Sequence, residues 1–410
     1  MKSPPAHRAT TAHLQAVYPL VTEAGLGARG TYLGRDLLGG SFCYDPWELY
    51  AQGVLTNPNM LVVGQIGRGK STFVKSLIWR MQLFGRRAWI VDPKGEYAVL
   101  AERCGAAALR VQPYGSVRLN PLDTPPGSPP EMDRRRGELL CSLVASSLGR
   151  DLTPAERTAA DLAVRSTGRR RQAPTLPEVI EAMLRPSPAA AASVHTDVPA
   201  LAGDGRPVAL ELRRLVEGDL AGMFDGPTTV GLDLRAPLVV LDLSALYGSP
   251  ALGVLMTCAT AWLQAALGVA DGAKRLVVVD EAWAILHNLG IARWMQATFK
   301  LARAFGVANV AVVHRLSDLQ AAGAAGSEQQ RLAEGLLSDS ETRVVFSQPP
   351  SELDAAVELL GLTSTEAELL PQLPRGVALW KVGTRSFLVE HRVGDDERAL
   401  VDTDDAMRVT

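Results

Sequence analysis

One short segment, residues 64–71 with the sequence GQIGRGKS, constrains this chain more than any other. It follows an apolar stretch at residues 60–63 and precedes apolar residues at helical spacing over 74–81. The spacing G-x-x-x-x-G-K-[ST] between a strand and a helix is typical of a phosphate-binding loop. A glycine-rich turn without a ligand is the simpler alternative. We favour the loop because motif, strand and helix occur together.

The residue types of this segment suit the phosphates of a nucleotide. Glycines let backbone N–H groups close around a β-phosphate, Lys70 reaches the β and γ oxygens, and the Ser71 hydroxyl can ligate Mg²⁺. ATP and Mg²⁺ are therefore the predicted cofactors. The predicted nucleotide-binding residues are Gly64, Gln65, Ile66, Gly67, Arg68, Gly69, Lys70, Ser71 and Thr72.

Composition narrows the class of protein. The 410 residues are 47% hydrophobic and 21% charged, with a net charge of −2, so no overall basic field points to nucleic acid, although local patches remain open. Four scattered cysteines without a C-x-x-C pair predict reduced thiols and no metal centre beyond the Mg-nucleotide. The N-terminal residues lack the apolar core of a signal peptide. We expect a cytoplasmic protein, with a peripheral place at the inner face of the cell membrane as an alternative.

Residues 251–270 carry no charge and are long enough to cross a bilayer. They lie between two strand-like runs, 238–243 and 276–280. Because helices that connect buried parallel strands are often apolar all round, we interpret this segment as a buried helix.

Strand-like and helical runs alternate along most of the chain, which predicts an α/β fold with a doubly wound, mainly parallel sheet. Residues 1–57 read as strands and turns leading into the domain that carries the phosphate-binding loop, and 58–123 as the first part of that domain. Residues 124–222 read as an all-helical insertion, because no convincing strand occurs there. Its basic and acidic residues balance, so its arginine runs indicate solvated helix faces, with DNA contacts as the alternative. Residues 223–410 complete the domain, with strands at 238–243, 276–280, 307–313 and 343–348 and a final hairpin at 377–382 and 386–389.

The run at 276–279 is apolar and ends in Asp280 and Glu281. Since parallel sheets bind ligands at the carboxyl ends of their strands, Asp280 is placed to hold Mg²⁺ through water and Glu281 to orient the attacking water. The pair could instead open a helix, where acidic residues suit the dipole. We favour the catalytic interpretation.

Two further strand ends carry polar residues. Glu96, in the segment DPKGEY at 92–97, could support the water or the metal, or belong to a surface turn. His314 follows the strand 307–313, where side chains commonly sense the γ-phosphate, or it could be a structural turn residue. Hydrolysis often needs an arginine from a neighbouring subunit. Arg303 and Arg343 are candidates, and a surface ion pair is the alternative for each.

The motifs, taken in order, resemble a known family. GQIGRGKS is followed by VDPKGEY, NPL, a helical stretch, MFDGPT, LVVVDEAW, RAFGVANVAVVHRLSDL, RVVFSQ, LGLTSTE and TDDAM. This order resembles the conjugative transfer and type IV secretion ATPases of the VirB/TraC type, in the HerA–FtsK superfamily of P-loop NTPases, particularly those of actinobacteria. The resemblance covers roughly residues 30 to 405.

The resemblance implies a RecA-like domain with an inserted helical domain, hexameric assembly, and ATP-driven work on DNA or protein transfer. It supports Lys70, Ser71, Asp280 and Glu281 as the ATPase core, with Arg303 and Arg343 acting in trans. Two departures stand out. The family usually has Gln where this chain has His314, and about 60 residues precede the loop where relatives usually have a large docking domain. We therefore expect a motor module, alone or with a separate partner.

Three functions follow as hypotheses. The first is an Mg²⁺-dependent ATPase that powers a membrane-associated conjugation or secretion machine. The second is a DNA translocase or helicase of the HerA, FtsK or coupling-protein kind, with DNA as a partner. The third is an ATP-binding assembly factor that does not hydrolyse.

Overall fold

The structure used here is a computed structural model that describes most of the chain. The described residues are 25–106, 108–123, 132–168, 174–218, 220–229, 236–247, 252, 255, 272–282, 295–296, 299–300, 302–317 and 327–401. The apolar helix predicted at 251–270 lies outside them, apart from Leu252 and Leu255. Among the helices that are described, none has the length and apolar character needed to cross a membrane.

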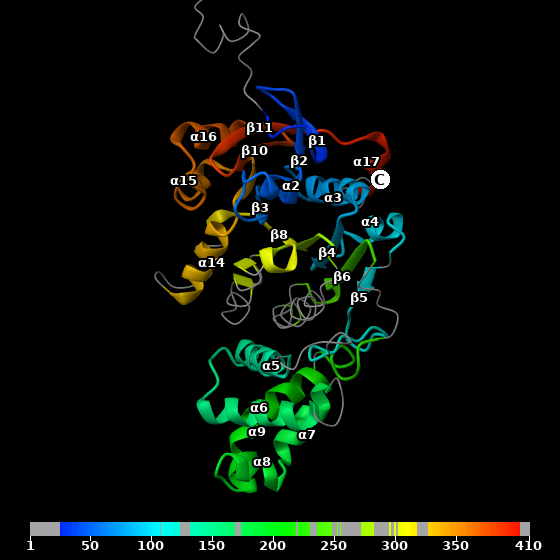
Figure 1. Cartoon of the computed structure of the whole chain (residues 1–410), viewed down its shortest axis with the longest axis vertical. Coiled ribbons are helices and arrows are strands. Elements are labelled where there is room, and N and C mark those ends of the chain that lie inside the picture. The colour runs from blue at the N-terminus through cyan, green and yellow to red at the C-terminus, as the bar shows by residue number, and fades with distance from the viewer. Residues whose placement is uncertain are drawn as a thin grey trace, which may run out of the picture.

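An eleven-stranded sheet organises the molecule, in the order β2-β1-β11-β10-β9-β3-β8-β7-β4-β6-β5 (Figure 1). Neighbours from β9 to β5 pair in parallel, whereas β10, β11, β1 and β2 add an antiparallel part at one side. The strands are β1 (Thr31–Asp36), β2 (Ser41–Tyr44), β3 (Met60–Val63), β4 (Arg87–Asp92), β5 (Ala108–Arg110), β6 (Leu238–Asp242), β7 (Arg275–Val279), β8 (Val307–Val313), β9 (Thr342–Phe346), β10 (Val377–Val382) and β11 (Arg385–His391).

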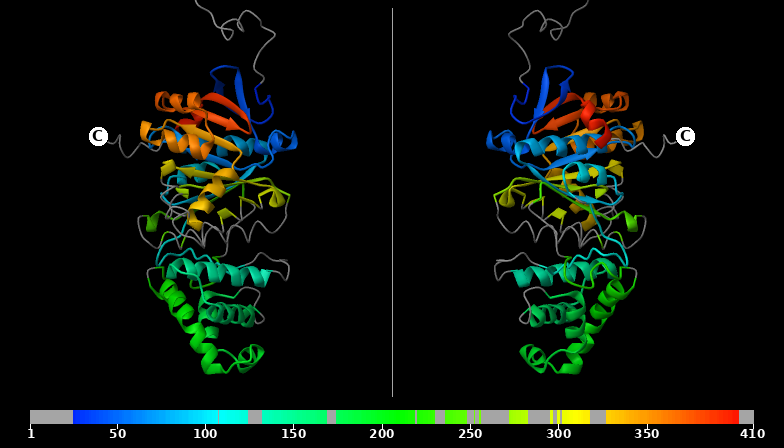
Figure 2. Two further views of the ribbon diagram at one scale, coloured as in Figure 1. Left: turned by 90° about the vertical axis from the view of Figure 1, so that its left-hand side faces the viewer. Right: turned by 90° about the vertical axis from the view of Figure 1, so that its right-hand side faces the viewer.

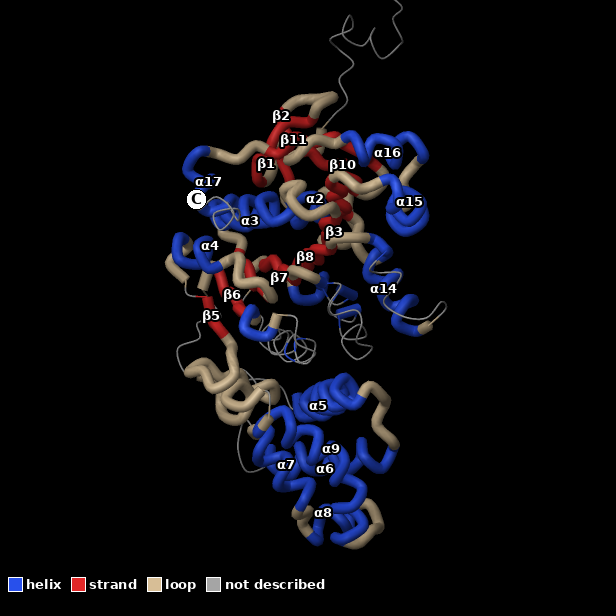
Figure 3. The backbone as a smooth tube through the Cα atoms, turned by 180° about the vertical axis from the view of Figure 1, so that it is seen from behind, coloured by secondary structure: helices blue, strands red, loops and turns tan. Residues whose placement is uncertain are grey.

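Helices lie near the sheet and in a separate group beyond it. Those near the sheet are α2 (Pro46–Ala51), α3 (Lys70–Met81), α4 (Ala98–Arg103), α14 (Glu328–Ser338), α15 (Leu353–Leu360), α16 (Ser364–Leu369) and α17 (Asp395–Val401), with 3₁₀ turns η1 (Gln82–Phe84), η2 (Ser244–Leu246), η3 (Pro350–Glu352) and η4 (Leu370–Gln372). The separate group comprises α5 (Met132–Leu148), α6 (Pro154–Gly168), α7 (Leu176–Leu184), α8 (Pro188–Ser193) and α9 (Val198–Glu217). Figures 2 and 3 show this group at the end of the molecule opposite β1 and β2.

The predicted fold class, an α/β protein with a mainly parallel, doubly wound sheet of the RecA-like type, is confirmed. The predicted strands all occur, with ends that differ by one or two residues. The described part of the predicted all-helical segment contains α5, α6, α7, α8 and α9, the last with Pro207 inside it. Within the described residues 132–222 there is no strand, but the domain boundaries at 57, 123 and 222 stay predictions.

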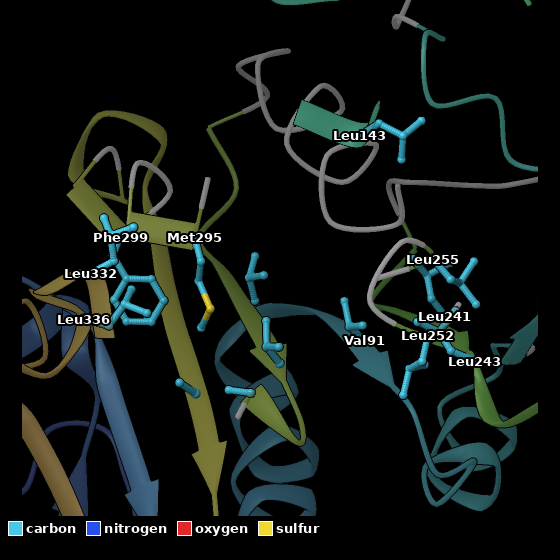
Figure 4. Close-up of a cluster of buried hydrophobic side chains, with 14 of the residues drawn as sticks. Val91, Leu143, Leu241, Leu243, Leu252, Leu255, Met295, Phe299, Leu332 and Leu336 are labelled. Carbon is cyan, nitrogen blue, oxygen red and sulfur yellow. The ribbon is translucent and has the colours of Figure 1, made fainter. Parts of the chain in front are cut away.

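The central strands are apolar on both faces, which explains their continuous hydrophobic runs. Alternate residues of β3, β4, β6, β7 and β8 enter two different cores. One core packs against α3 and α4, and the other continues into the helical insertion through α5 and α9. Figure 4 shows part of the second core, with Val91 and Leu241 on the strands and Leu143 on the insertion. A shared core thus joins the insertion to the sheet.

Aromatic rings fasten the antiparallel part of the sheet to α3. The imidazole of His391, at the end of β11, lies 4.6 Å from the ring of Phe73 and 5.4 Å from that of Phe346. Its Nδ1 lies 3.1 Å from the Gly376 carbonyl oxygen, and the Trp380 Nε1–H donates to its Nε2 at 3.1 Å. These two bonds assign a neutral imidazole with the proton on Nδ1. Burial lowers the pKa of His391 to about 3.

We expect His391 to make the protein acid-sensitive. Its folded-state pKa lies below the unfolded value of about 6.5, so the unfolded chain binds more protons between these values. The free energy of unfolding should fall as the pH drops below about 6.5, by up to about 1.4 kcal/mol per pH unit. Urea unfolding from pH 7 to pH 4.5 measures this slope. His391→Gln should flatten the slope, and an unchanged slope would contradict the prediction.

Candidate functional site

The loop between β3 and α3 has the backbone that its glycines predict. A Cβ on Gly64 would lie 2.5 Å from Cβ of Phe346 on β9. Only glycine therefore allows the loop and the end of β9 to lie this close. Gly67 and Gly69 have φ of 77° and 108°, in the left-handed region that favours glycine. The chain thus turns directly into the N-terminus of α3, where backbone N–H groups are free to bind an anion.

Lys70, the first residue of α3, lies folded over this loop with 4% of its surface exposed. Its Nζ donates to the carbonyl oxygens of Gly64 and Gln65, the latter at 3.0 Å. Burial lowers the pKa of Lys70 to about 8, although the nearby Asp280 and Glu281 oppose this shift. Of the other predicted loop residues, Ile66 and Gly67 are exposed, whereas Gln65, Arg68, Gly69, Ser71 and Thr72 are half-buried.

Asp280 and Glu281 directly follow β7, and both are buried. The Asp280 N–H donates to the carbonyl of Val91 on neighbouring β4 at 3.2 Å, and the Tyr97 hydroxyl donates to Asp280 Oδ2 at 3.2 Å. Burial raises the pKa of Asp280 to about 6. Glu281 has φ of 52°, an uncommon value for a residue with a side chain, which the surrounding contacts must hold in place.

Three neighbouring strands contribute to the contacts of the Glu281 carboxylate. Lys94 follows β4 and His314 follows β8, on either side of β7 in the sheet. Glu281 Oε1 forms an ion pair with Lys94 Nζ and lies 2.6 Å from His314 Nε2. The Glu281 side chain is 2% exposed and that of Lys94 25% exposed, so this charge pair is largely shielded from water.

The segment 92–97 is fixed by its own aspartate. The Asp92 carboxylate accepts the backbone N–H groups of Lys94, Gly95 and Tyr97 at 2.9 to 3.2 Å. This turn presents Lys94 to Glu281 and Tyr97 to Asp280. Glu96 is half-buried in the same turn, and its charge favours the protonated form of both Lys70 and Asp280. Glu96 therefore lies near Lys70 and Asp280. Its role in supporting the water or the metal stays a prediction.

The two candidate arginines lie apart from this group. Arg303 is exposed in helical backbone at 302–305. Arg343 pairs with Leu61 across β9 and β3, three residues before Gly64, and donates to the carbonyl oxygens of Leu360 and Leu337 at 2.7 and 3.4 Å. Arg343 thus holds the ends of α15 and α14 within its own chain. The roles of both arginines in trans stay predictions.

The structure adds residues that the sequence did not single out. Lys94 and Tyr97 stand in the segment where only Glu96 was named, and their position just after a strand-like run was the available sequence signal.

Comparisons with known proteins identify similar folds. The AAA-like domain family matches residues 51–119. VirB4 of Thermoanaerobacter pseudethanolicus superposes with a TM-score of 0.74 at 24% identity, covering 90% of this chain and 98% of that one. The fold is that of VirB4. The plasmid coupling protein TrwB, in complex with ADP and Mg²⁺, superposes with a TM-score of 0.62 at 16% identity, covering 91% of each chain. Among curated proteins none matches. The predicted resemblance is therefore confirmed at the level of the fold.

The ion pair of Lys94 gives a stability prediction. Lys94→Met leaves the buried Glu281 carboxylate without its cation, which should lower the free energy of unfolding by about 2–3 kcal/mol. Adding Glu281→Gln removes the uncompensated charge, so the double variant should recover part of this loss. Denaturant unfolding of both single variants and the double variant gives the coupling energy. Additive losses would show that the two side chains do not interact.

Proposed function

We propose that this chain is an Mg²⁺-dependent ATPase. The observation that carries the proposal is the convergence of Lys70, Asp280 and Glu281 at the carboxyl ends of β3 and β7. Asp280 and Glu281 both favour the protonated form of Lys70, which supports the proposal that the three groups act together. A phosphate-binding loop beside two buried carboxylates suits phosphoryl transfer, in which positioning and charge stabilisation do most of the work.

The residues of the site fit the parts of the reaction. Lys70 and the loop N–H groups would hold the phosphates, and the Ser71 hydroxyl and the Asp280 carboxylate are hard oxygen ligands that suit Mg²⁺. When bound, Mg²⁺ neutralises phosphate charge. Glu281 is placed to take the proton of a water that attacks the γ-phosphorus, while the bond to the β–γ bridging oxygen breaks and ADP leaves. Lys94 and His314 hold the carboxylate in the conformation that this step needs.

A cavity of about 110 Å³ adjoins the loop and suits the nucleoside end of the same ligand. Gly69, Thr72 and Ser76 line it from the loop and α3, and Arg375 and Arg392 line it from the antiparallel part of the sheet. Leu33, Phe73 and Val393 add apolar walls to the same cavity. This arrangement supports a nucleoside triphosphate over a free phosphate as the ligand.

At a finer level, we propose that hydrolysis powers a conjugation or type IV secretion machine, with a hexamer as the working assembly. The support is the shared fold with VirB4 and TrwB and the order of motifs along the chain. TrwB has been solved in complex with ADP and Mg²⁺ and, separately, in complex with a non-hydrolysable ATP analogue. Hydrolysis that depends on added DNA and weakens steeply with salt would support the translocase hypothesis instead.

ATP turnover tests the ATPase proposal directly. Wild type should hydrolyse ATP in the presence of Mg²⁺, and Glu281→Gln should lower kcat at least about 100-fold while ATP still binds. Lys70→Ala should lose binding as well. Phosphate release and calorimetric binding measure the two effects. Equal, near-zero rates in wild type and Glu281→Gln would reject hydrolysis, and retained ATP binding would then favour the assembly factor.

The two arginines give separable predictions. Arg303→Ala should lower turnover at least tenfold with little change in thermal unfolding, because Arg303 is exposed and free to reach a neighbouring site. Arg343→Ala should lower the free energy of unfolding by about 1–3 kcal/mol, because it removes the guanidinium that donates to the Leu360 and Leu337 carbonyl groups. Turnover and unfolding are measured on both variants. A stability loss confined to Arg303→Ala would reverse the assignment.

A further inference from the structure

Lys94 makes contacts that reach across two strands of the sheet. It follows β4, yet its Nζ forms an ion pair with Glu281 after β7 and lies 3.2 Å from Nε2 of His314 after β8. The turn that carries Lys94 is fixed, because the buried Asp92 carboxylate accepts the N–H groups of Lys94 and Gly95. The fold itself therefore brings this ammonium group to the ends of β7 and β8.

The contacts of the Lys94 ammonium use only part of its hydrogen-bonding capacity. Nε2 of His314 lies 2.6 Å from Glu281 Oε1, and because an ionised carboxylate only accepts, this nitrogen carries a proton. It therefore cannot accept a hydrogen bond from Lys94. Glu281 and the Tyr247 ring, 5.9 Å from Nζ, engage at most two of the three N–H groups of Lys94. One donor is thus left for an acceptor outside the described residues.

The same contacts bring Lys94 to the start of the phosphate-binding loop. Strands β8 and β3 pair in register up to their last residues, so His314 and Gly64, which follow them, lie side by side. The Lys94 ammonium lies beside His314, and the Lys70 ammonium donates to the carbonyl oxygen of Gly64. Two lysine side chains from different strands thus approach the point where the loop begins.

Lys94 keeps its positive charge in this setting. Burial lowers its pKa, but the contact with Glu281 outweighs this effect and leaves the pKa above its usual value. The Lys94 side chain is 25% exposed, whereas that of Glu281 is 2% exposed. Solvent, and a ligand in its place, can therefore reach Lys94.

We propose that Lys94 donates to a γ-phosphate oxygen and so makes the site prefer a nucleoside triphosphate to a diphosphate. This inference rests on the proposed ATPase function, in which one water molecule separates Glu281 from the γ-phosphorus. Because Lys94 contacts the same carboxylate, its remaining N–H group reaches the oxygens on that phosphorus while the ion pair with Glu281 stays intact. ADP has no phosphate at this place, so only the triphosphate gains this charge-assisted hydrogen bond.

The test uses Glu281→Gln as its background, because this variant should bind ATP and hydrolyse it at least about 100-fold more slowly. Without the carboxylate, Lys94→Met leaves no uncompensated buried charge, so the double variant should fold. Calorimetry with Mg²⁺ measures the affinities for ATP and ADP with and without Lys94→Met. ATP affinity should fall at least about tenfold, or about 1.4 kcal/mol, whereas ADP affinity should stay within about twofold.

Two further variants in the same background complete the comparison. Lys94→Arg keeps the cation and should keep most of the preference for ATP. Lys381→Met is the matched control, because Lys381 on β10 also pairs with a carboxylate, 3.1 Å from Glu366, and its side chain is 13% exposed. Its register partner Arg343 lies opposite Leu61, three residues before the loop. This substitution removes the same charge elsewhere and should leave both affinities within about twofold.

Three results would overturn the proposal for Lys94 while leaving the ATPase function intact. They are an unchanged ratio of ATP to ADP affinity in Lys94→Met, an equal loss of both affinities, and an equal change of the ratio in Lys381→Met. Failure of both wild type and Glu281→Gln to bind either nucleotide would instead overturn the ATPase function, and the role of Lys94 with it. The measurements on these two proteins thus separate the two failures.

Discussion

The parallel hydrogen bonds that hold β3 between β8 and β9 fix the geometry of the whole site. They bring the phosphate-binding loop and His314 to one edge of the sheet, although about 250 residues separate the two. The next pairings, β8 with β7 and β7 with β4, add the carboxylates and Lys94 at the same edge. Since side-chain positions follow from strand register, a slip of one residue would turn each of these groups to the opposite face.

Charge balance within the site depends on this arrangement. Lys70 and Lys94 bring two cations to a region that contains Asp92, Asp280 and Glu281, all largely shielded from water. A buried charge without a partner of opposite sign costs free energy, and a nearby opposite charge offsets part of that cost. Burial lowers the pKa of Lys70 although the nearby carboxylates oppose this shift, whereas burial and the neighbouring carboxylates together raise the pKa of Asp280.

The sequence predicted the parts of the site that are local and missed those that depend on pairing. The loop at residues 64–71 and the Asp280–Glu281 pair follow from short patterns of strand, glycine and acid. Lys94 does not, because its importance comes from lying beside β7 in the sheet. Arg343 shows the same limit, since its contacts with Leu337 and Leu360 join helices whose positions no local pattern gives.

The order of the strands also bears on how the chain is made. The loop at 64–69 emerges from the ribosome long before β8, β9 and the hairpin whose Gly376 N–H donates to its Arg68 carbonyl. The insertion, by contrast, holds many contacts between its own helices α5, α6, α7 and α9 and is complete by residue 217. During synthesis the insertion can therefore fold early, while β3 waits with two open edges for more than 200 residues of later chain. In this interval the unpaired edges of β3 make the incomplete chain prone to aggregation.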